Sequence, residues 1–368
     1  MPEVLSTRRL NRALLARQAL LERTDDDPVA MTARLVGLQA QEPAPPFVGL
    51  WSRIAGFERE ALLSALRDAR VVRATAMRGT IHLLTAEDYA RHRLTLGSVL
   101  RTALRMPHLK AVAEETDVEA VTTLAHRLLT EEPRPIGALH GPLHDAFPQV
   151  DGAALAQAAR MLLPLVQVPT PGHPEGFAGN AAFAPAERIV RAPLTPEGPP
   201  HELVRRYLSA FGPATAADAT KWSGLTHLRL VLAELDGLVT FEDQRGRTLY
   251  DLEDAPRPPE DVRAPTRFLP RFDNALLSHA DHERVLAPEH RPHVFTVNGI
   301  VHGTVLHDGF VVGTWRPEVA GDGTTVRVVP FRRPSRRAAA SIRAEGRRLA
   351  RFLAPGARRR DVEIAAAA

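Results

Sequence analysis

The sequence feature that most constrains the fold is a series of three helical segments that ends in a β-hairpin. After a cap at Ser6 or Thr7, apolar residues recur every three or four positions, which is the spacing of a helix with one buried face. Two β-rich runs then flank Arg78-Gly79, a signal for a hairpin turn. Three helices followed by a hairpin is the order of a winged helix. After the first helix, the series comprises helices over 29–40 and 57–68 and strands over Val71–Met77 and Thr80–Leu84.

The same order of helices and strands recurs twice further along the chain. The second series ends in a proline- and glycine-rich turn of wing type, and the third ends in a hairpin. We therefore predict three tandem winged-helix units. The second series covers helices over 117–129, Ile136–Leu143 and 152–164 and a strand over Leu165–Val168; the third covers helices over 200–210 and 226–235, a helix start at Gly212–Thr215, and strands over Leu238–Phe241 and Thr248–Leu252.

A proline-rich linker over 254–265 precedes a β-rich region. Asn298-Gly299 and Asp308-Gly309 are strong signals for two-residue hairpins. The predicted fold is α+β, with three tandem winged-helix units, a small antiparallel β-sheet or barrel-like unit, and a C-terminal helix over 335–353. The strands of the last unit are predicted over Val294–Val297, Ile300–Leu306, Phe310–Trp315 and Thr325–Val329. The predicted boundaries of the four units are 1–104, 105–195, 196–253 and 254–368.

The composition excludes several kinds of chemistry. Without cysteine, the chain has no disulfide, no thiolate zinc site and no cysteine nucleophile. Only Lys110 and Lys221 could form a Schiff base, so water is favoured over lysine as a nucleophile. No nucleotide-binding fingerprint occurs, and His279-Ala-Asp281-His282-Glu283 lacks a standard metal-ligand spacing, so we expect no cofactor and no metal. Because no apolar run approaches 18 residues and no secretory signal opens the chain, we expect a cytoplasmic protein without a membrane partner.

Arginine dominates the positive charge. All but two of the 47 basic residues are arginine, although the net charge is only +4. Guanidinium groups form bidentate contacts with phosphate and with guanine edges, so the basic surface suits DNA. The most basic stretch is the C-terminal helix with the residues behind it, which is either a solvated helix face or a DNA contact. Its arginines are Arg336, Arg337, Arg343, Arg347, Arg348, Arg351, Arg358, Arg359 and Arg360.

Two glutamines, Gln39 and Gln41, flank one small apolar residue ahead of a proline run. On a helix, residues two apart point to different sides, whereas in an extended chain they share a face. Pro43 disfavours helix at Glu42, so the predicted helix over 29–40 frays near Gln41 and both amides can converge on one target. Because glutamine is neutral at every pH, such a site would position and stabilise a water or a developing charge. The alternative is a pair of polar residues that cap a helix end.

The sequence around these glutamines resembles that of a known family. Gln39-Ala40-Gln41-Glu42-Pro43 is followed by Pro46-Phe47-Val48-Gly49-Leu50-Trp51-Ser52-Arg53, then by Val72 to Leu84 with Arg73-Ala74-Thr75-Ala76-Met77-Arg78-Gly79-Thr80-Ile81-His82, and late in the chain by Gly313-Thr314-Trp315-Arg316. This set is similar to the AlkZ/YcaQ superfamily of bacterial winged-helix DNA glycosylases. Glutamine at position 41 matches the Gln-Φ-Gln motif of the AlkZ-like branch, and Ala40 is a weakly hydrophobic version of Φ.

The resemblance implies a monofunctional glycosylase that removes bulky N7-alkylated purines by hydrolysis, in a superfamily whose members also unhook interstrand crosslinks. In this scheme Gln39 orients the attacking water and Gln41 assists it. The partner would be double-stranded DNA that carries alkylpurine lesions or crosslinks, and the asymmetric chain is expected to act as a monomer. Such enzymes serve base excision repair or self-resistance to a DNA-alkylating natural product. The residues expected to contact the DNA backbone are Arg73, Arg78, His82 and Arg316.

Two other functions fit the same sequence. Winged helices most often regulate transcription, so a non-catalytic DNA-binding protein is the first alternative. Transcription regulators often bind symmetric operators as dimers, and three different units in one chain lack that symmetry. The second alternative is a protein that sequesters a genotoxic antibiotic directly, without DNA.

Overall fold

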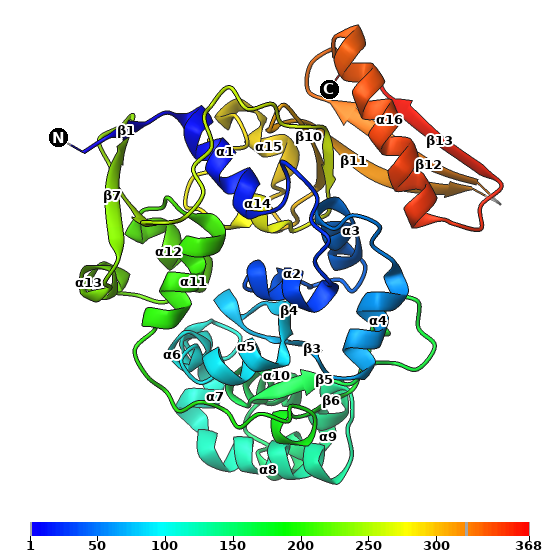
Figure 1. Ribbon diagram of the computed structural model, residues 1–368. Helices are drawn as coiled ribbons and strands as arrows, with labels where there is room; N and C mark the ends of the chain where they lie inside the picture. The colour runs from blue at the N-terminus through cyan, green and yellow to red at the C-terminus, as the bar shows by residue number, and fades with distance from the viewer. Residues whose placement is uncertain (1, 321–322, 368) are drawn as a thin grey trace.

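The computed structural model describes residues 2–320 and 323–367. Within them the chain forms helices and three small open sheets, which confirms the predicted α+β class (Figure 1). Across these residues, no helix combines the length and apolar character that crossing a bilayer requires.

A five-stranded sheet at the centre of the molecule combines the first two predicted units. Its strands follow the order β2-β4-β3-β5-β6, and all neighbours are antiparallel. The hairpin predicted between residues 71 and 84 is confirmed as β3 and β4, joined by a 3₁₀ turn over Met77–Gly79. The strands are β2 Leu38–Gln39, β3 Val71–Thr75, β4 Ile81–Thr85, β5 Leu165–Gln167 and β6 Phe183–Pro185.

Of the helices of the first unit, α2, α4 and α5 pack against this sheet, whereas α1 lies away from it and contacts α11 (His201–Phe211) (Figure 1). Ser6, Asp27 and Thr85 each cap a helix start by accepting a backbone N–H, which is the role that short polar side chains favour. The helices are α1 Thr7–Arg17, α2 Pro28–Arg34, α3 Pro45–Arg53, α4 Arg59–Arg67, α5 Ala86–His92 and α6 Gly97–Arg101.

The predicted helix over 29–40 is wrong in its second half. The helix α2 ends at Arg34, because Val36 and Gly37 adopt left-handed backbone angles, with φ of 52° and 94°. At Gly37 a side chain would also meet the Leu83 carbonyl oxygen 2.8 Å away, so glycine is required. The chain then enters β2, and this turn places Gln39 in a strand.

The proline run after the motif begins a helix that the sequence analysis did not identify. Pro45 and Pro46 occupy the first turn of α3, where the missing N–H of proline costs nothing. Every residue of α3 is buried. Its last residue, Arg53, forms a bidentate ion pair with Asp273 at 2.8 Å on both sides, with the side chains 0% and 1% exposed.

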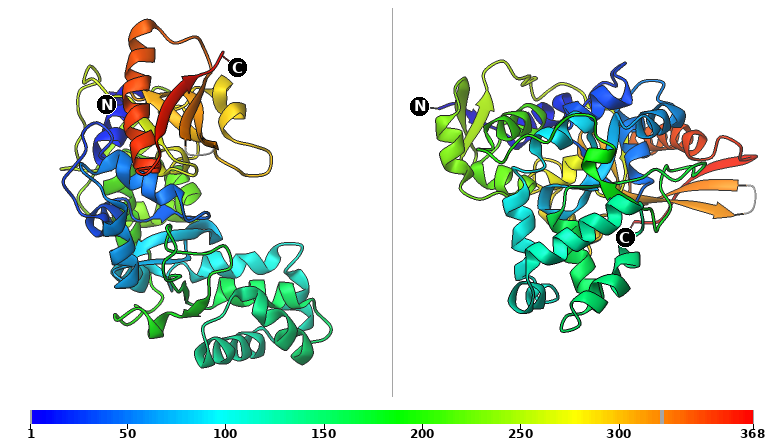
Figure 2. Two further views of the ribbon diagram at one scale, coloured as in Figure 1. Left: turned by 90° about the vertical axis from the view of Figure 1, so that its right-hand side faces the viewer. Right: turned by 90° about the horizontal axis from the view of Figure 1, so that it is seen from below.

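The second unit projects from the central sheet as a helical lobe (Figures 1 and 2). Its helices pack through a small core of their own, which includes Val121, Leu129, Leu143 and Leu155. The lobe consists of α7 Lys110–Glu115, α8 Val118–Glu131, α9 His140–Ala146 and α10 Gly152–Leu162.

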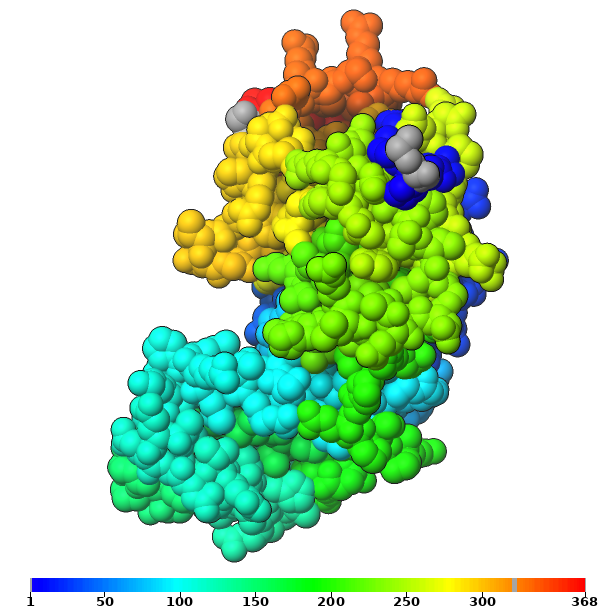
Figure 3. Space-filling model, turned by 90° about the vertical axis from the view of Figure 1, so that its left-hand side faces the viewer, coloured from blue at the N-terminus to red at the C-terminus, as the bar shows by residue number. Residues whose placement is uncertain are grey.

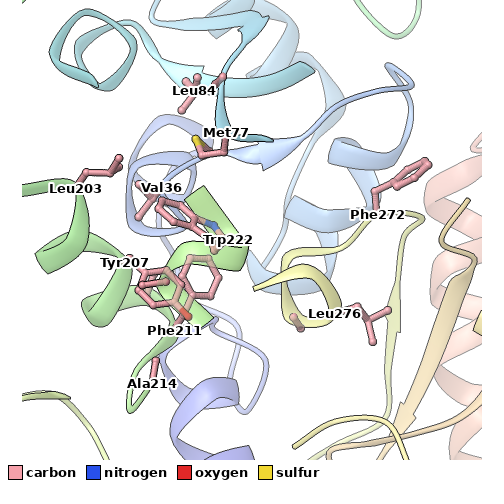
Figure 4. Close-up of a cluster of buried hydrophobic side chains, with 14 of the residues drawn as sticks. Val36, Met77, Leu84, Leu203, Tyr207, Phe211, Ala214, Trp222, Phe272 and Leu276 are labelled. Carbon is pink, nitrogen blue, oxygen red and sulfur yellow. The ribbon is translucent and has the colours of Figure 1, made fainter. Parts of the chain in front are cut away.

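The third unit closes on the first through aromatic packing. Trp222 lies 5.0 Å from the ring of Tyr207 and 5.8 Å from that of Phe211, and Figure 4 shows the three near Val36 and Met77 of the first unit. The hairpin of this unit also pairs with the N-terminal strand β1 in parallel. The elements are β1 Val4–Leu5, α11 His201–Phe211, α12 Ala216–Ser223, α13 Leu228–Glu234, β7 Leu238–Asp243 and β8 Thr248–Leu252.

The C-terminal unit is an open five-stranded sheet in the order β13-β12-β11-β10-β9, covered on one face by α16. The Asp308-Gly309 hairpin is confirmed, with φ of 49° and 85° at the two turn residues. The sheet is not purely antiparallel, because β13 pairs with β12 in parallel. Its elements are β9 Arg267–Leu269, α14 Asn274–Leu277, α15 Arg291–Val294, β10 Gly303–His307, β11 Phe310–Ala320, β12 Gly323–Pro330, α16 Arg336–Leu353 and β13 Arg359–Ile364.

One predicted strand in this unit is wrong, and one strand was not predicted. The segment over Val294–Val297 is the end of α15 followed by the turn at Asn298-Gly299, which the bridge between Phe295 and Val301 closes without forming a hairpin of two strands. The basic tail from Arg359 forms the edge strand β13. Since strands and cores are shared across the predicted units, the boundaries at 104, 195 and 253 stay predictions.

The Arg53–Asp273 pair gives a test of how the units are held together. We expect Asp273→Ala to lower the free energy of unfolding by about 3–5 kcal/mol, because it leaves a buried guanidinium without its partner. Chemical denaturation of wild type and variant measures this. Glu60→Ala, which removes an exposed carboxylate from the pair with Arg67, is the control and should change stability by less than about 1 kcal/mol. An equal effect of the two substitutions would contradict the argument.

Candidate active site

The two glutamines of the motif flank a buried alanine. Gln39 ends β2 and pairs with His82 of β4, the Ala40 amide donates to the Ile81 carbonyl at 2.7 Å, and Gln41 lies in the bend that follows. Leu38 and Ala40 are in the core, with 4% and 0% of their surface exposed. Gln39 is half-buried and Gln41 is exposed. This alternation of burial places both amides on the side away from the core.

Each amide oxygen already has one donor. The Arg78 guanidinium donates to Gln39 Oε1 at 2.8 Å, and the Ile81 backbone amide donates to Gln41 Oε1 at 3.4 Å. An amide oxygen has two lone pairs, so each can accept a further hydrogen bond. The contact with Arg78 also settles the orientation of the Gln39 amide, because only its oxygen can accept from a guanidinium.

Arg73 holds the backbone of the motif. Its guanidinium donates to the Ala40 carbonyl at 2.8 Å and 3.0 Å and to the Gln41 carbonyl at 3.1 Å, and it also contacts Gln167 on β5. It lies over the ring of Phe177, and Arg73 is only 4% exposed. Burial lowers the pKa of Arg73 to about 10, so the group remains charged at neutral pH. Arg73 therefore fixes the path of the chain between the two glutamines.

Arg78 lies in the turn of the β3–β4 hairpin with φ of 56°. Besides Gln39, it donates to the backbone carbonyl of Trp222 on α12. Burial lowers its pKa to about 10, and it too is charged at neutral pH. One guanidinium thus links the first glutamine to the third unit. No sequence signal predicts this link, because Trp222 contributes only its backbone carbonyl.

His82 is neutral at physiological pH. It is 2% exposed, and its Nδ1–H donates to the Thr80 carbonyl at 3.0 Å. Burial, with the nearby charge of Arg78 as a further cause, lowers its pKa to about 3. Its buried position in β4, opposite Gln39, matches a structural support for the motif.

Arg316 lies apart from these residues. It is on β11 in the C-terminal sheet, its side chain is 70% exposed, and it pairs with Glu318 at 2.8 Å. The structure therefore brings together Gln39, Gln41, Arg73, Arg78 and His82, but not Arg316.

The surface is hollowed beside the central sheet. Figure 3 shows a notch between the helical lobe and the C-terminal unit, with segments of the first unit at its floor.

Among the residues that the structure describes, no group of three or more His, Asp or Glu side chains is arranged to hold a metal ion. His279, singled out in the sequence, bonds to Ser278 and to the Phe211 carbonyl and is part of the core.

Comparison with known proteins identifies the class of protein to which this site belongs. The sequence model of the AlkZ-like DNA glycosylases matches residues 32–352, a span that includes both glutamines. The chain therefore belongs to the family of AlkZ-like DNA glycosylases.

Two relatives from Streptomyces sahachiroi support this assignment. The first is an interstrand DNA cross-link repair glycosylase that is 27% identical over 332 residues, which cover 82% of this chain and 85% of the relative. The second is the solved structure of the DNA glycosylase AlkZ, with a TM-score of 0.79 and 24% identity, covering 98% of this chain and all of that one. The structural likeness confirms the fold.

The buried histidines predict how stability depends on pH. The pKa of His82 and of His279 is lowered by burial to about 3, below the ordinary value of 6.5, so the unfolded chain binds more protons between these values. Stability is therefore full above about pH 6.5 and falls as the pH drops toward 3, by up to about 1.4 kcal/mol per pH unit for each group. Urea unfolding between pH 7 and pH 4.5 measures the slope. A free energy of unfolding that stays constant over this range would contradict the assignment.

Proposed function

We propose that this DNA glycosylase hydrolyses the N-glycosidic bond of bulky N7-alkylated purines in duplex DNA and that Gln39 and Gln41 carry the reaction. The observation that supports this most directly is the pair of neutral amides at the end of β2 and in the bend after it, each with an unused lone pair. Alkylation at N7 makes the purine cationic and a good leaving group. The site then needs only to hold a water and to stabilise an oxocarbenium-like sugar with oriented dipoles.

In the proposed reaction, the free lone pair of Gln39 Oε1 accepts a hydrogen bond from water and orients it toward C1′. The carbonyl dipole of Gln41, which is more exposed and more loosely held, faces the sugar. Water forms the new bond to C1′ as the bond to N9 breaks, and the purine leaves with the bonding electrons, which neutralise its cationic ring. The proton that the attacking water loses passes to bulk solvent. Because amides are weak bases, normal purines would not be released, and this failure provides selectivity.

Arg73 and Arg78 support this proposal in two ways. Arg73 fixes the carbonyls between the glutamines, and Arg78 fixes the Gln39 amide. A cation 2.8 Å from Gln39 Oε1 would disfavour a cationic sugar unless an anion compensates for it. We therefore assign a phosphate next to the lesion as the second partner of Arg78, which retains its expected role in DNA binding. His82 supports the motif from the neighbouring strand β4, and Arg316 would contact the DNA backbone farther along the duplex.

The notch seen in Figure 3 supports a duplex laid across the first unit, with the helical lobe and the C-terminal unit on either side. Such a groove approach would suit adducts that cannot be rotated into a deep pocket. The name of the relative from Streptomyces sahachiroi describes interstrand crosslink repair, and we propose the same substrate class here, with a monomeric enzyme. A role in self-resistance to a DNA-alkylating natural product fits this substrate class.

The central prediction concerns Gln39. We expect Gln39→Ala to slow excision of an N7-alkylguanine by about 10²–10³, because a preorganised dipole at the reacting centre is lost. Single-turnover release of the base at saturating enzyme measures this, with affinity for the duplex unchanged within about twofold. Gln149→Ala, an exposed glutamine of the helical lobe, is the matched control.

The outcomes of this assay distinguish the alternative functions. Excision by Gln39→Ala at the wild-type rate would exclude the motif as the catalytic site. Binding of DNA without excision by either protein would favour a non-catalytic DNA-binding protein, whereas tight binding of the free alkylating drug would favour sequestration.

A second prediction separates positioning by Arg78 from simple DNA contact. If Arg78 holds the Gln39 amide, Arg78→Met should lower the single-turnover rate by about 10²-fold even at saturating enzyme, because small misplacements of a reacting group are costly. If Arg78 only contacts phosphate, the affinity for the duplex should weaken, and the slope of log affinity against log salt concentration should become smaller in magnitude by about one. The single-turnover rate at saturating enzyme would then be unchanged. Arg70→Met, which removes an exposed arginine of the same unit, serves as the control.

A further inference from the structure

The helix α16 carries a strongly charged surface that the proposed reaction does not use. Its apolar side packs on the C-terminal sheet, with Ile342 and Leu349 fully buried. Its exposed side consists of arginine and alanine alone. The exposed residues are Arg336, Arg337, Ala340, Arg343, Ala344, Arg347, Arg348 and Arg351.

Four of these arginines, Arg336, Arg337, Arg347 and Arg351, form the arginine face. Within residues 2–320 and 323–367, none of the four has a carboxylate or hydrogen-bond partner. The one acidic residue of α16, Glu345, is 7% exposed and bonds to Arg23 instead. Exposed arginines elsewhere are of both kinds: some have partners, such as Arg67 with Glu60 and Arg91 with Glu87, whereas others, such as Arg105, Arg191 and Arg229, have none among the described residues. The unpaired ones lie on separate segments, whereas the arginine face gathers four of them on one helix.

Helix stability does not explain the arginine face either. Arg336 and Arg337 lie in the first turn of α16, which contains no acidic residue. The helix macrodipole is positive at this end, so cations are unfavourable there and an anion would be stabilised. Only Arg351, in the last turn, is placed where a cation favours the helix.

The shape of the arginine face fits the backbone of a duplex. From Arg336 to Arg351 the helix rises about 22 Å, which corresponds to roughly six base pairs of DNA. The alanines between the arginines let a phosphate backbone approach closely, and guanidinium groups bind phosphate in a bidentate manner. A lipid surface is disfavoured, because membrane-bound helices place large apolar side chains beside their basic ones and those of α16 are buried in its own sheet.

The arginine face points away from the notch. In the left view of Figure 2, α16 lies on one side of the C-terminal sheet, whereas the helical lobe projects on the opposite side. A short duplex held in the notch would therefore leave the arginine face open. We propose that the arginine face of α16 binds the sugar–phosphate backbone of a second duplex segment, separate from the segment that carries the lesion. This inference goes beyond excision, because it gives the enzyme a way to hold two stretches of DNA at once.

The experiment counts duplexes. An undamaged 16-base-pair duplex is titrated into the full-length protein at low salt, and the number bound per protein is measured by sedimentation. Wild type is expected to bind two. The triple variant Arg336→Gln/Arg347→Gln/Arg351→Gln is expected to bind one, since glutamine keeps helix propensity but removes the charges. The plot of log affinity against log salt for the second event should have a slope of about −3.6 in wild type, because each of the four arginines of the face neutralises one phosphate.

The control removes the same charge elsewhere. Arg67→Gln/Arg91→Gln/Arg127→Gln replaces three exposed arginines that have partners, and it should still bind two duplexes. Excision of a lesion in a short duplex should be unchanged within twofold in both triple variants. Because undamaged DNA is counted, the result does not depend on whether the catalytic proposal holds.

Several outcomes would overturn the proposal. One is binding of a single duplex by wild type, and another is binding of the second duplex by the α16 variant. Loss of short-duplex excision in the α16 variant, with folding intact by thermal melting, would make the arginine face part of the lesion site. If poly-glutamate of equal charge binds the face as tightly as the duplex does, an acidic protein is the partner instead.

Discussion

The fold depends on one buried ion pair, Arg53 with Asp273. Two fully buried charges are tolerated only when their geometry is good and their other donors are satisfied. Here Arg53 also bonds to the Gly49 carbonyl and to Gln18, whose amide in turn donates to the Ala210 carbonyl at 2.9 Å, and among the described residues only its Nε has no partner. Asp273 at the same time caps α14. Four parts of the chain must therefore assemble together, because the absence of any one would leave a further buried polar group without a partner. They are the end of α1, the helix α3, the third unit and the C-terminal unit.

The geometry of the motif follows from this assembly. On one side of Gln39 the left-handed turn at Val36 and Gly37 ends a helix and starts a strand, and on the other side α3 anchors the chain through Arg53. Between them the carbonyls are held by Arg73 from a neighbouring strand. The glutamines themselves need no shifted pKa, because amides act through orientation. A neutral site of this kind depends more on rigid support than one that relies on a carboxylate, so most of the charged residues nearby serve to fix the backbone.

How far the sequence predicts this structure depends on the range of the interactions. The β3–β4 hairpin and the Asp308-Gly309 turn were predicted correctly because their signals are local. The extension of a helix through Gln39 was wrong because Gly37 is required by the Leu83 carbonyl, which lies far away in sequence. The strand β13 was missed because its basic composition is untypical of strands and it forms only by pairing with β12. The contact between Arg78 and Trp222 could not be foreseen, since a backbone carbonyl leaves no trace in composition.

The central sheet has a consequence for how this enzyme could be divided. Its strand β3 pairs on one side with β4 and on the other with β5, which arrives from beyond the helical lobe. If the chain were cut ahead of the lobe, β3 would become an open edge, and unpaired strand edges promote association between molecules. The residues of the motif are thus contiguous in sequence, but the motif cannot be transferred alone. The smallest fragment of the chain that holds these residues in place already includes the lobe. New lesion preferences would have to be engineered within the whole protein, by exchanging loops and surface residues.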